Sequence, residues 1–157
     1  MIVRRAAPRD AEGLARMLGK ARCEDGVVGH EIEPELFRAH AFGASAHFEA
    51  WIARDKPDWA GCAVAHRGYD IRSMRPTFVL AALYVEPGYR RTGLARGLLG
   101  KVCARAIEVG ARQLAITAGL QNAQGINFLC AIGAQEQSTA AYMLSFDHLE
   151  WLAQELS

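Results

Sequence analysis

The chain has 157 residues, of which 51% are hydrophobic, and its formal net charge is +1. A chain of this length and composition can bury a sizeable core, and we expect residues 1–157 to form a single domain. A net charge this close to zero produces no field that would steer the protein to nucleic acid or to a membrane surface, so neither is expected as a partner.

The cysteines and the apolar pattern indicate the cellular compartment. The four cysteines are far apart in the chain and form no C-x-x-C pair: Cys23, Cys62, Cys103 and Cys130. They are expected to be free thiols in a reducing environment. A transmembrane helix needs an apolar run of about 18 residues, and no run in this sequence is that long. Residues 1–10 lack the apolar region of a secretory signal. We therefore expect a cytoplasmic protein, and no bound metal is expected.

The first half of the chain alternates between helical and extended patterns. Leu14, Met17 and Leu18 recur at helical spacing. Phe48 and Ile52 lie on one side of an alternating pattern that is typical of a strand. In chain order we expect a strand over residues 1–7, helices over 8–24 and 31–43, and strands over 47–55, 59–70 and 77–85.

The second half contains two more helical patterns. Residues 77–85 are continuously apolar, as in a central strand that is covered on both faces. Leu94, Leu98 and Val102 then form one row of a helix. We expect a helix over 92–109, a strand over 111–118, a helix over 121–134, and a strand that runs into a terminal helix over 140–153. This order predicts a mixed α/β fold with one central sheet.

The turn between strand 77–85 and the next helix has an unusual composition. Residues 88–97 read GYRRTGLARG, with two adjacent arginines and three glycines. A strand that feeds a helix directs the unpaired N–H groups of the helix at the turn, and these donors bind anions. Gly93 lets the backbone approach a ligand closely, and Arg90 and Arg91 add charge. The turn is therefore a candidate phosphate site.

Two common phosphate motifs are excluded at this turn. A P-loop requires Lys directly after its second glycine, and Leu94 follows Gly93 here; the glycines also do not match the G-x-G-x-x-G of a dinucleotide fingerprint. Gly97 and Gly100 each weaken the helix by about 1 kcal/mol relative to alanine. We expect close packing against the sheet to offset this cost.

Two segments together resemble a known family. Arg90, Gly93 and Ala95 form the pattern R-x-x-G-x-A, which resembles the pyrophosphate-binding turn of the GCN5-related N-acetyltransferases. Further along the chain, QNAQGINFLCAIGA resembles the second cofactor segment of that family through Asn122 and Phe128. The resemblance extends over nearly the whole chain and is strongest to the diamine (spermidine/spermine) and thialysine acetyltransferase branch.

The resemblance implies a fold, a cofactor and a set of site residues. The fold would be a bent mixed sheet whose two central parallel strands splay apart to admit the pantetheine arm of acetyl-CoA. The N–H of Val85 would polarise the acetyl carbonyl, and the backbone of Leu83 and Val85 would align the pantetheine like an added strand. A homodimer through the C-terminal strands is also implied. The residues expected to bind acetyl-CoA are Leu83, Val85, Arg90, Arg91, Thr92, Gly93, Leu94, Ala95, Arg96, Asn122, Phe128 and Leu129.

The catalytic side chains depart from the pattern of this branch. The acidic pair that the branch carries on the central strand is replaced by Ala81 and Ala82. The tyrosine that usually serves as general acid aligns with Leu129, which cannot donate a proton. Tyr84 is the nearest phenol in sequence and is therefore the candidate catalytic side chain, together with the backbone of Val85.

Glu24 and Asp25 follow the first helix, where the branch places an acceptor-binding acid, so both are candidate acceptor-binding residues. We favour an N-acetyltransferase in which the primary amine of a small molecule attacks directly in a ternary complex. A less charged amine or an amino acid is preferred to a polyamine, because the carboxylates that attract a polycation are missing. The alternative is an acetyl-CoA-binding module with weak or lost catalysis. A phosphate- or nucleic-acid-binding domain is disfavoured by the near-neutral charge.

Overall fold

The computed structural model describes residues 1–29 and 31–155. The chain forms two compact units, residues 1–126 and residues 127–157, and each is described by itself. That they make a single domain stays a prediction. In the described part of the chain, no helix is long and apolar enough to cross a membrane.

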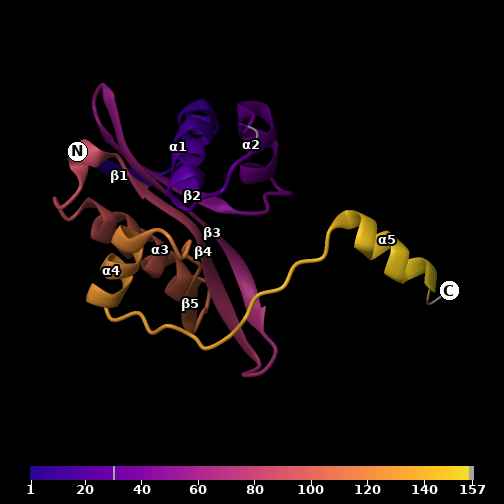
Figure 1. Cartoon of the computed structure of the whole chain (residues 1–157). Helices are drawn as coiled ribbons and strands as arrows, with labels where there is room; N and C mark the ends of the chain where they lie inside the picture. Colours follow the sequence, from indigo (N-terminus) through magenta and orange to yellow (C-terminus); the bar gives the residue numbers. More distant parts are fainter. Residues whose placement is uncertain (30, 156–157) are drawn as a thin grey trace. The chain divides into compact units, whose positions relative to one another are not determined.

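The first unit is a five-stranded mixed sheet with helices on both faces (Figure 1). The strands lie in the order β1-β2-β3-β4-β5, antiparallel from β1 to β4 and parallel between β4 and β5. The elements in chain order are β1 (Ile2–Arg5), the 3-10 turn η1 (Pro8–Asp10), α1 (Ala11–Glu24), α2 (Pro34–Ala41), β2 (Glu49–Asp55), β3 (Asp58–Asp70), β4 (Arg75–Val85), the 3-10 turn η2 (Pro87–Tyr89), α3 (Leu94–Glu108), β5 (Gln113–Ile116) and α4 (Ala123–Ala131), which runs into the second unit. The expected α/β class is confirmed, with element boundaries shifted by a few residues.

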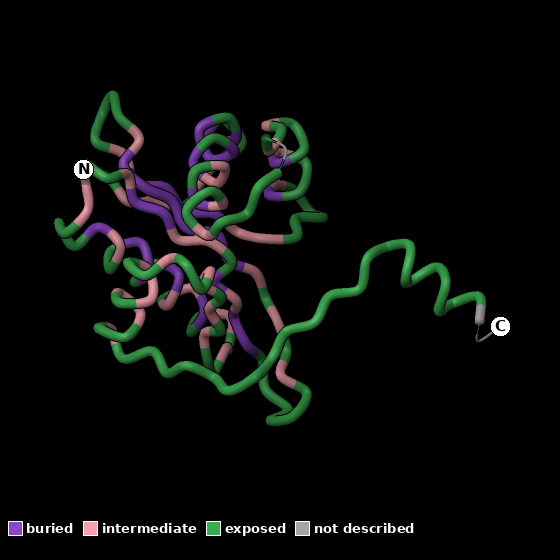
Figure 2. The backbone as a smooth tube through the Cα atoms, in the orientation of Figure 1, coloured by how far each residue is buried: buried purple, intermediate pink, exposed green. Residues whose placement is uncertain are grey.

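The core is divided between the two faces of the sheet. Helices α1 and α2 cover one face and α3 covers the other (Figure 1). The apolar row predicted for α1 is buried, and Leu14 and Met17 pack into one cluster with Ile52 and Tyr84. On α3, Leu98 and Val102 are fully buried. Buried backbone is accordingly concentrated in the strands and the inner sides of these helices (Figure 2).

A salt bridge fixes the start of α1. Asp10 is only 2% exposed, and both of its carboxylate oxygens accept hydrogen bonds from Arg4, at 2.8 and 2.9 Å. The backbone N–H of Ala7 also donates to this carboxylate, at 2.8 Å. Burial alone would raise the pKa of Asp10, but these bonds and the positive charges of Arg4 and Arg9 lower it overall. The carboxylate therefore stays ionised and ties the helix to β1.

Strands β4 and β5 pair over only a short length. The parallel ladder joins Thr77–Leu80 of β4 to Gln113–Ile116 of β5, and it ends there because β5 ends. On the other side of β4, the register with β3 passes from Leu80 directly to Ala82, so Ala81 is a bulge. A bulge bends the strand and increases its twist. The last five residues of β4 therefore diverge from the line of β5, in agreement with the expected splay.

The second unit contains the end of α4 and α5 (Phe146–Glu155). The terminal helix is present as expected. The prediction of a strand before it is wrong, because residues 139–145 adopt no regular structure. A strand needs a neighbouring backbone to pair with, and none pairs with this segment in the described residues. Its side chains are correspondingly exposed, with Tyr142 at 91% and Met143 at 95%.

Candidate functional site

The free edge of β4 presents two residues whose backbone groups point away from β3. The N–H of Glu86 donates to the carbonyl of Ala60 at 2.9 Å, so the backbone of Glu86 faces β3. Backbone direction alternates along a strand. The N–H and C=O groups of Leu83 and Val85 therefore face the edge that β5 does not cover, where the carbonyl of Val85 accepts a hydrogen bond from Arg90. An extended ligand can pair with this edge as an additional strand would.

The turn after β4 is shaped to approach an anion. Arg91 and Gly93 adopt left-handed φ values of +61° and +86°, and α3 begins directly afterwards. The first hydrogen bond of the helix runs from the N–H of Gly97 to the carbonyl of Gly93, at 3.0 Å. The N–H groups of residues 94–96 precede it and are therefore unpaired within the helix. The hydroxyl of Thr92 closes the turn by donating to the carbonyl of Tyr89 at 2.6 Å.

The glycines of this turn and of α3 leave open space where a side chain would lie. A Cβ built on Gly93 meets no protein atom within 4 Å, so its place is open to a ligand. The same is true of Gly97 and Gly100, both of which are exposed. We expected Gly97 and Gly100 to pack closely against the sheet and so offset their cost to the helix. This expectation is therefore wrong. Gly97 instead leaves the backbone of the first turn of α3 uncovered on its solvent-facing side.

The two arginines of the turn differ in their surroundings. Arg91 is exposed, as is Arg96 one turn further on, and both can reach a bound anion. Arg90 is half-buried, and its guanidinium is held by the protein: Nε donates to the carbonyl of Val85 at 2.8 Å, and a second nitrogen donates to Gln124 at 2.7 Å. It also forms an ion pair with Glu24. The positive charge nearest to solvent is therefore that of Arg91 and Arg96.

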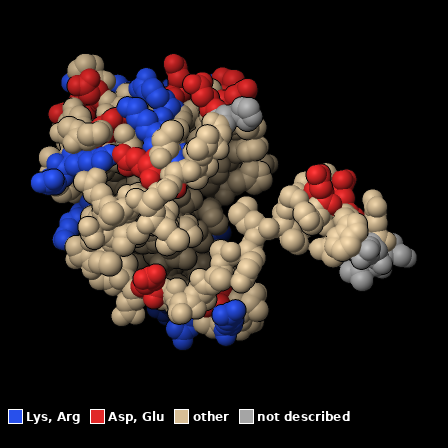
Figure 3. All heavy atoms as spheres, in the orientation of Figure 1, with Lys and Arg blue, Asp and Glu red and all other residues tan. Residues whose placement is uncertain are grey.

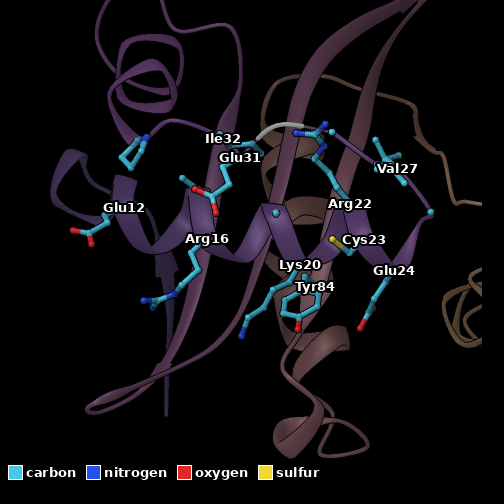
Figure 4. Close-up of a pocket in the computed structure, with 16 residues that line it drawn as sticks. Glu12, Arg16, Lys20, Arg22, Cys23, Glu24, Val27, Glu31, Ile32 and Tyr84 are labelled. Carbon is cyan, nitrogen blue, oxygen red and sulfur yellow. The ribbon is translucent and has the colours of Figure 1, made fainter.

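A pocket of about 810 Å³ lies between α1 and the segment that leads to α2. This size suits a small-molecule ligand. One wall is formed by successive turns of α1, with Glu12, Arg16, Lys20 and Glu24, and Tyr84 of β4 contributes to the lining. Figure 4 shows Arg16, Lys20 and the Tyr84 hydroxyl on the same side of α1. Charges of both signs line the pocket, so it is not selective for a polycation.

Tyr84 is the only residue of β4 among those that line the pocket in the described part of the chain. The phenol is 5% exposed and donates a hydrogen bond to Glu86 at 3.3 Å. Glu86 is also ion-paired with Lys20 of α1. Burial, followed by the negative charges of Glu86 and Glu24, raises the pKa of Tyr84 to about 12. The phenol therefore keeps its proton at neutral pH and can act as a proton donor.

Glu24 and Asp25, predicted to bind the acceptor, are both engaged by the protein. Glu24 lines the pocket but pairs with Arg90. Asp25 accepts hydrogen bonds from the side-chain amide of Asn122 at 3.0 Å and from the N–H of Gly119 at 3.3 Å. The structure thus brings these acids together with two of the residues predicted to bind the cofactor.

The remaining predicted cofactor residues lie on α3 and α4. Leu94 is buried and Ala95 is half-buried at the start of α3, so they contribute backbone rather than exposed side chains. Phe128 and Leu129 lie on the part of α4 that belongs to the second unit, and both are half-buried. Leu129 stands where the resembled family usually has a tyrosine, and its apolar side chain offers no proton.

Sequence reasoning missed three residues of this site. Lys20, Glu86 and Gln124 contact Tyr84 or Arg90 directly or through one partner. Glu86 could have been found from its position, because it lies two residues after Tyr84 and therefore on the same face of the strand. Lys20 and Gln124 carry no local signal, since their partners are distant in the chain.

Comparisons with known proteins find a matching family model, a related sequence and similar structures. The family model described as Acetyltransferase (GNAT) family matches residues 15–133. A thialysine N-epsilon-acetyltransferase from Mus musculus is 26% identical over 154 residues, which cover 92% of this chain and 89% of that protein. A ribosomal-protein-alanine N-acetyltransferase from Brucella melitensis biovar Abortus 2308 has a similar structure, with a TM-score of 0.73 at 18% identity over 93% of this chain and 100% of that one. An aminoglycoside N-acetyltransferase solved in complex with CoA has a TM-score of 0.76 at 19% identity, covering 92% and 94% of the two chains.

The open space at Gly93 generates a testable prediction. Replacing Gly93 with valine places a branched side chain where a phosphate would lie, so the affinity for coenzyme A should fall by about tenfold or more, equivalent to about 1.4 kcal/mol. Isothermal titration calorimetry measures this directly. Gly110→Val is the matched control, because Gly110 also has a left-handed φ, of +81°, and no atom lies within 4 Å of the place that its Cβ would take.

Both substitutions carry the same backbone strain, so both should lower thermal stability. Only the change at Gly93 should affect coenzyme binding. Equal coenzyme affinity in the two variants would show that the turn does not hold the phosphates.

Proposed function

We propose, because this chain belongs to the acetyltransferase (GNAT) family, that it transfers the acetyl group of acetyl-CoA to the primary amine of a small molecule. The chain is an N-acetyltransferase with acetyl-CoA as co-substrate. The observation that carries the acceptor proposal is the pocket between α1 and the segment that leads to α2, whose volume suits a small ligand and whose lining includes Tyr84 of β4. The named acceptors of the mouse relative and of the aminoglycoside enzyme, thialysine and aminoglycosides, are small amines as well.

Residues of the free edge and the turn fit the coenzyme. The N–H groups of residues 91–96 and the side chains of Arg91 and Arg96 would hold the pyrophosphate. The backbone of Leu83 would pair with the pantetheine, because the carbonyl of Val85 already accepts from Arg90 and its N–H is left for the acetyl carbonyl. Acetyl-CoA supplies the activated acetyl group as a thioester when it is bound.

The chain's own groups then have defined tasks in the transfer. The N–H of Val85 donates to the acetyl carbonyl oxygen as negative charge develops there. The pocket holds the amine in line, so that its nitrogen bonds to the acetyl carbon as the carbon–sulfur bond breaks. Tyr84, which keeps its proton at neutral pH, supplies that proton to the departing sulfur. The amine is expected to enter in its neutral form; the proton that its nitrogen loses on forming the amide would pass to water, and water would return a proton to Tyr84.

The charges of the pocket favour an acceptor other than a polyamine. Ala81 is exposed and Ala82 is half-buried at the position where carboxylates would be needed. Glu24 and Glu86 are neutralised by Arg90 and Lys20. The acidic groups closest to Tyr84 are therefore already paired, and a multiply charged amine gains little attraction from them.

The proposal is tested with a panel of amines. The purified protein is incubated with acetyl-CoA and single amines of different charge, including amino acids, an aminoglycoside and spermidine, and the acetylated products are identified by mass spectrometry. We expect at least one amino acid or weakly charged amine to be acetylated, with a kcat/KM about tenfold or more above that for spermidine.

The panel also separates the proposal from its alternatives. Binding of acetyl-CoA without transfer to any amine would favour a binding module. Spermidine as the best acceptor would show that the paired carboxylates still attract a polycation, and would contradict the charge argument.

Tyr84→Phe tests the proton donor. This change removes one hydroxyl and keeps the packed ring, so kcat should fall by about 100-fold while the KM for acetyl-CoA changes little. Because the pKa of Tyr84 is raised to about 12, the wild-type rate should show no decline from phenol ionisation between pH 7 and pH 10. Tyr69→Phe is the control, since Tyr69 is 53% exposed on β3 and is not among the described residues that line the pocket. An unchanged kcat in Tyr84→Phe would remove this residue from the mechanism.

We further propose a homodimer in the cytoplasm. The second unit exposes a group of large apolar side chains that a single chain leaves in water: Tyr142, Met143, Leu144, Phe146, Leu149 and Trp151. In the first unit, β5 is an outermost strand of the sheet. Exposed edges and apolar patches of this kind are typical of interfaces. All four cysteines are free, which fits a reducing compartment, and cell fractionation would check the location.

Sedimentation at micromolar concentration tests the assembly. The wild-type protein should sediment as a dimer, and Met143→Asp with Leu149→Asp should shift it to a monomer, because a charge in an apolar interface is costly. A wild-type monomer under these conditions would contradict the proposal. On the face seen in Figure 3, basic side chains lie among acidic ones, which gives no support to a nucleic-acid partner instead.

A further inference from the structure

Arg90 makes contacts with three different elements around the pocket. Its Nε–H donates to the carbonyl at the end of β4, one terminal nitrogen donates to Gln124 at the start of α4, and the other pairs with Glu24 at the end of α1. Its guanidinium also lies 5.8 Å from the centre of the Tyr84 ring. A guanidinium is planar and holds its donors in a fixed geometry. With three of its five donors used, Arg90 sets the position of α1 relative to the coenzyme turn.

Asp25 makes a second connection beside the first. Its carboxylate accepts hydrogen bonds from Asn122 and from the N–H of Gly119. The backbones approach closely here, since a Cβ on Gly119 would lie 2.7 Å from the carbonyl oxygen of Asp25. A Cβ on Gly26 would lie closer still, 1.0 Å from the side-chain nitrogen of Gln121. The end of α1 is thus fixed both to the turn before α3 and to the segment before α4.

The chain that leaves this end of α1 forms the rim of the pocket. Residues 26–29, 31 and 32 line it. The N–H groups of Asp25, Gly26 and Val27 are bonded to the carbonyls of the last helical turn, at 3.1, 3.1 and 2.8 Å. Any change in how Glu24 and Asp25 are held therefore reaches the rim through one short, hydrogen-bonded segment.

We infer that Arg90 and Asp25 are positioning residues that couple the coenzyme site to the acceptor pocket. Arg90 acts through Glu24, and Asp25 acts through Asn122. A coenzyme that orders the turn and the Asn122 segment also orders the rim, so that each substrate strengthens the binding of the other. The inference rests on the proposed function, because it assigns the turn to coenzyme and the pocket to the acceptor. It also assigns Glu24 to a structural link rather than to direct contact with the amine.

Hydrogen exchange tests the coupling without catalysis. The amides of Asp25, Gly26 and Val27 are followed with and without coenzyme A in the wild type and in Arg90→Gln, Glu24→Gln and Asp25→Ala. Coenzyme A should slow their exchange about tenfold in the wild type. The slowing should be largely lost in each variant.

Arg105→Gln is the matched control. Arg105 pairs with Glu49 at 3.0 Å, and its side chain is 22% exposed, against 23% for Arg90. Replacing Arg105 removes a comparable ion pair, between α3 and β2, and neither partner is among the described residues that line the pocket. The coenzyme effect on the three amides should persist in this variant. If Arg90→Gln fails to fold, Glu24→Gln breaks the same link with a smaller change.

Binding and kinetics give a second readout that a general loss of stability would not imitate. In Arg90→Gln, the affinity for coenzyme A should change less than about threefold, whereas the KM for the best amine should rise about tenfold. Arg91→Gln should show the reverse, because its exposed side chain is assigned to the phosphates. A reversed pattern between these two arginines would overturn the inference.

The two proposals fail in different ways. If no amine is acetylated, the proposed function fails, but the exchange measurement still decides the coupling. If coenzyme A leaves the three amides unchanged in the wild type, or slows them equally in all variants, the coupling is overturned even where acetylation is efficient.

Discussion

The architecture of the site depends on the point at which β4 separates from β5. The parallel ladder ends at Leu80, and the bulge at Ala81 turns the strand away. From there no strand of the described residues lies beside Leu83 and Val85, and the carbonyl of Val85 accepts a hydrogen bond from Arg90 instead. Buried backbone groups without partners are costly, so an edge of this kind is maintained only where water or a ligand satisfies it. The same divergence places the end of β4 against the start of α3.

The charges around this edge are largely satisfied within the protein. Lys20 pairs with Glu86, and Glu24 pairs with Arg90, each across two elements. These pairs hold α1 against the end of β4, and they leave the exposed arginines of the turn as the groups that can attract an anion. As a result, the carboxylates beside Tyr84, Glu24 and Glu86, are already paired. Under the proposed function, this arrangement would separate the recognition of a phosphate-bearing co-substrate from that of a weakly charged amine.

Local features of the site could be predicted from the sequence, whereas its long-range contacts could not. Gly93 and the arginines before it indicated the turn, because a residue with left-handed φ at a helix start is usually glycine. The partners of Glu24 and Asp25 lie 66 and 97 residues away, and no local pattern specifies which carboxylate meets which donor. Both acids were predicted to contact the acceptor, which stays a prediction; the structure adds their bonds to Arg90 and Asn122.

The strand predicted before the terminal helix illustrates the same limit. Tyr142, Met143 and Leu144 have the apolar character of a strand, but a strand exists only where another backbone accepts its hydrogen bonds. The sequence of one chain does not show whether that backbone belongs to the same chain or to another. The exposed apolar side chains are the observation that the sequence alone could not supply.

The central claim is that acetyl-CoA lies along the free edge of β4 with its phosphates at the start of α3. The most direct measurement is an NMR titration of the isotope-labelled protein with coenzyme A, in which the backbone amides are followed one by one. The largest shifts should occur at residues 91–96 and at Leu83 and Val85. Saturating coenzyme A that leaves these amides unchanged, or that shifts a different surface, would contradict the claim.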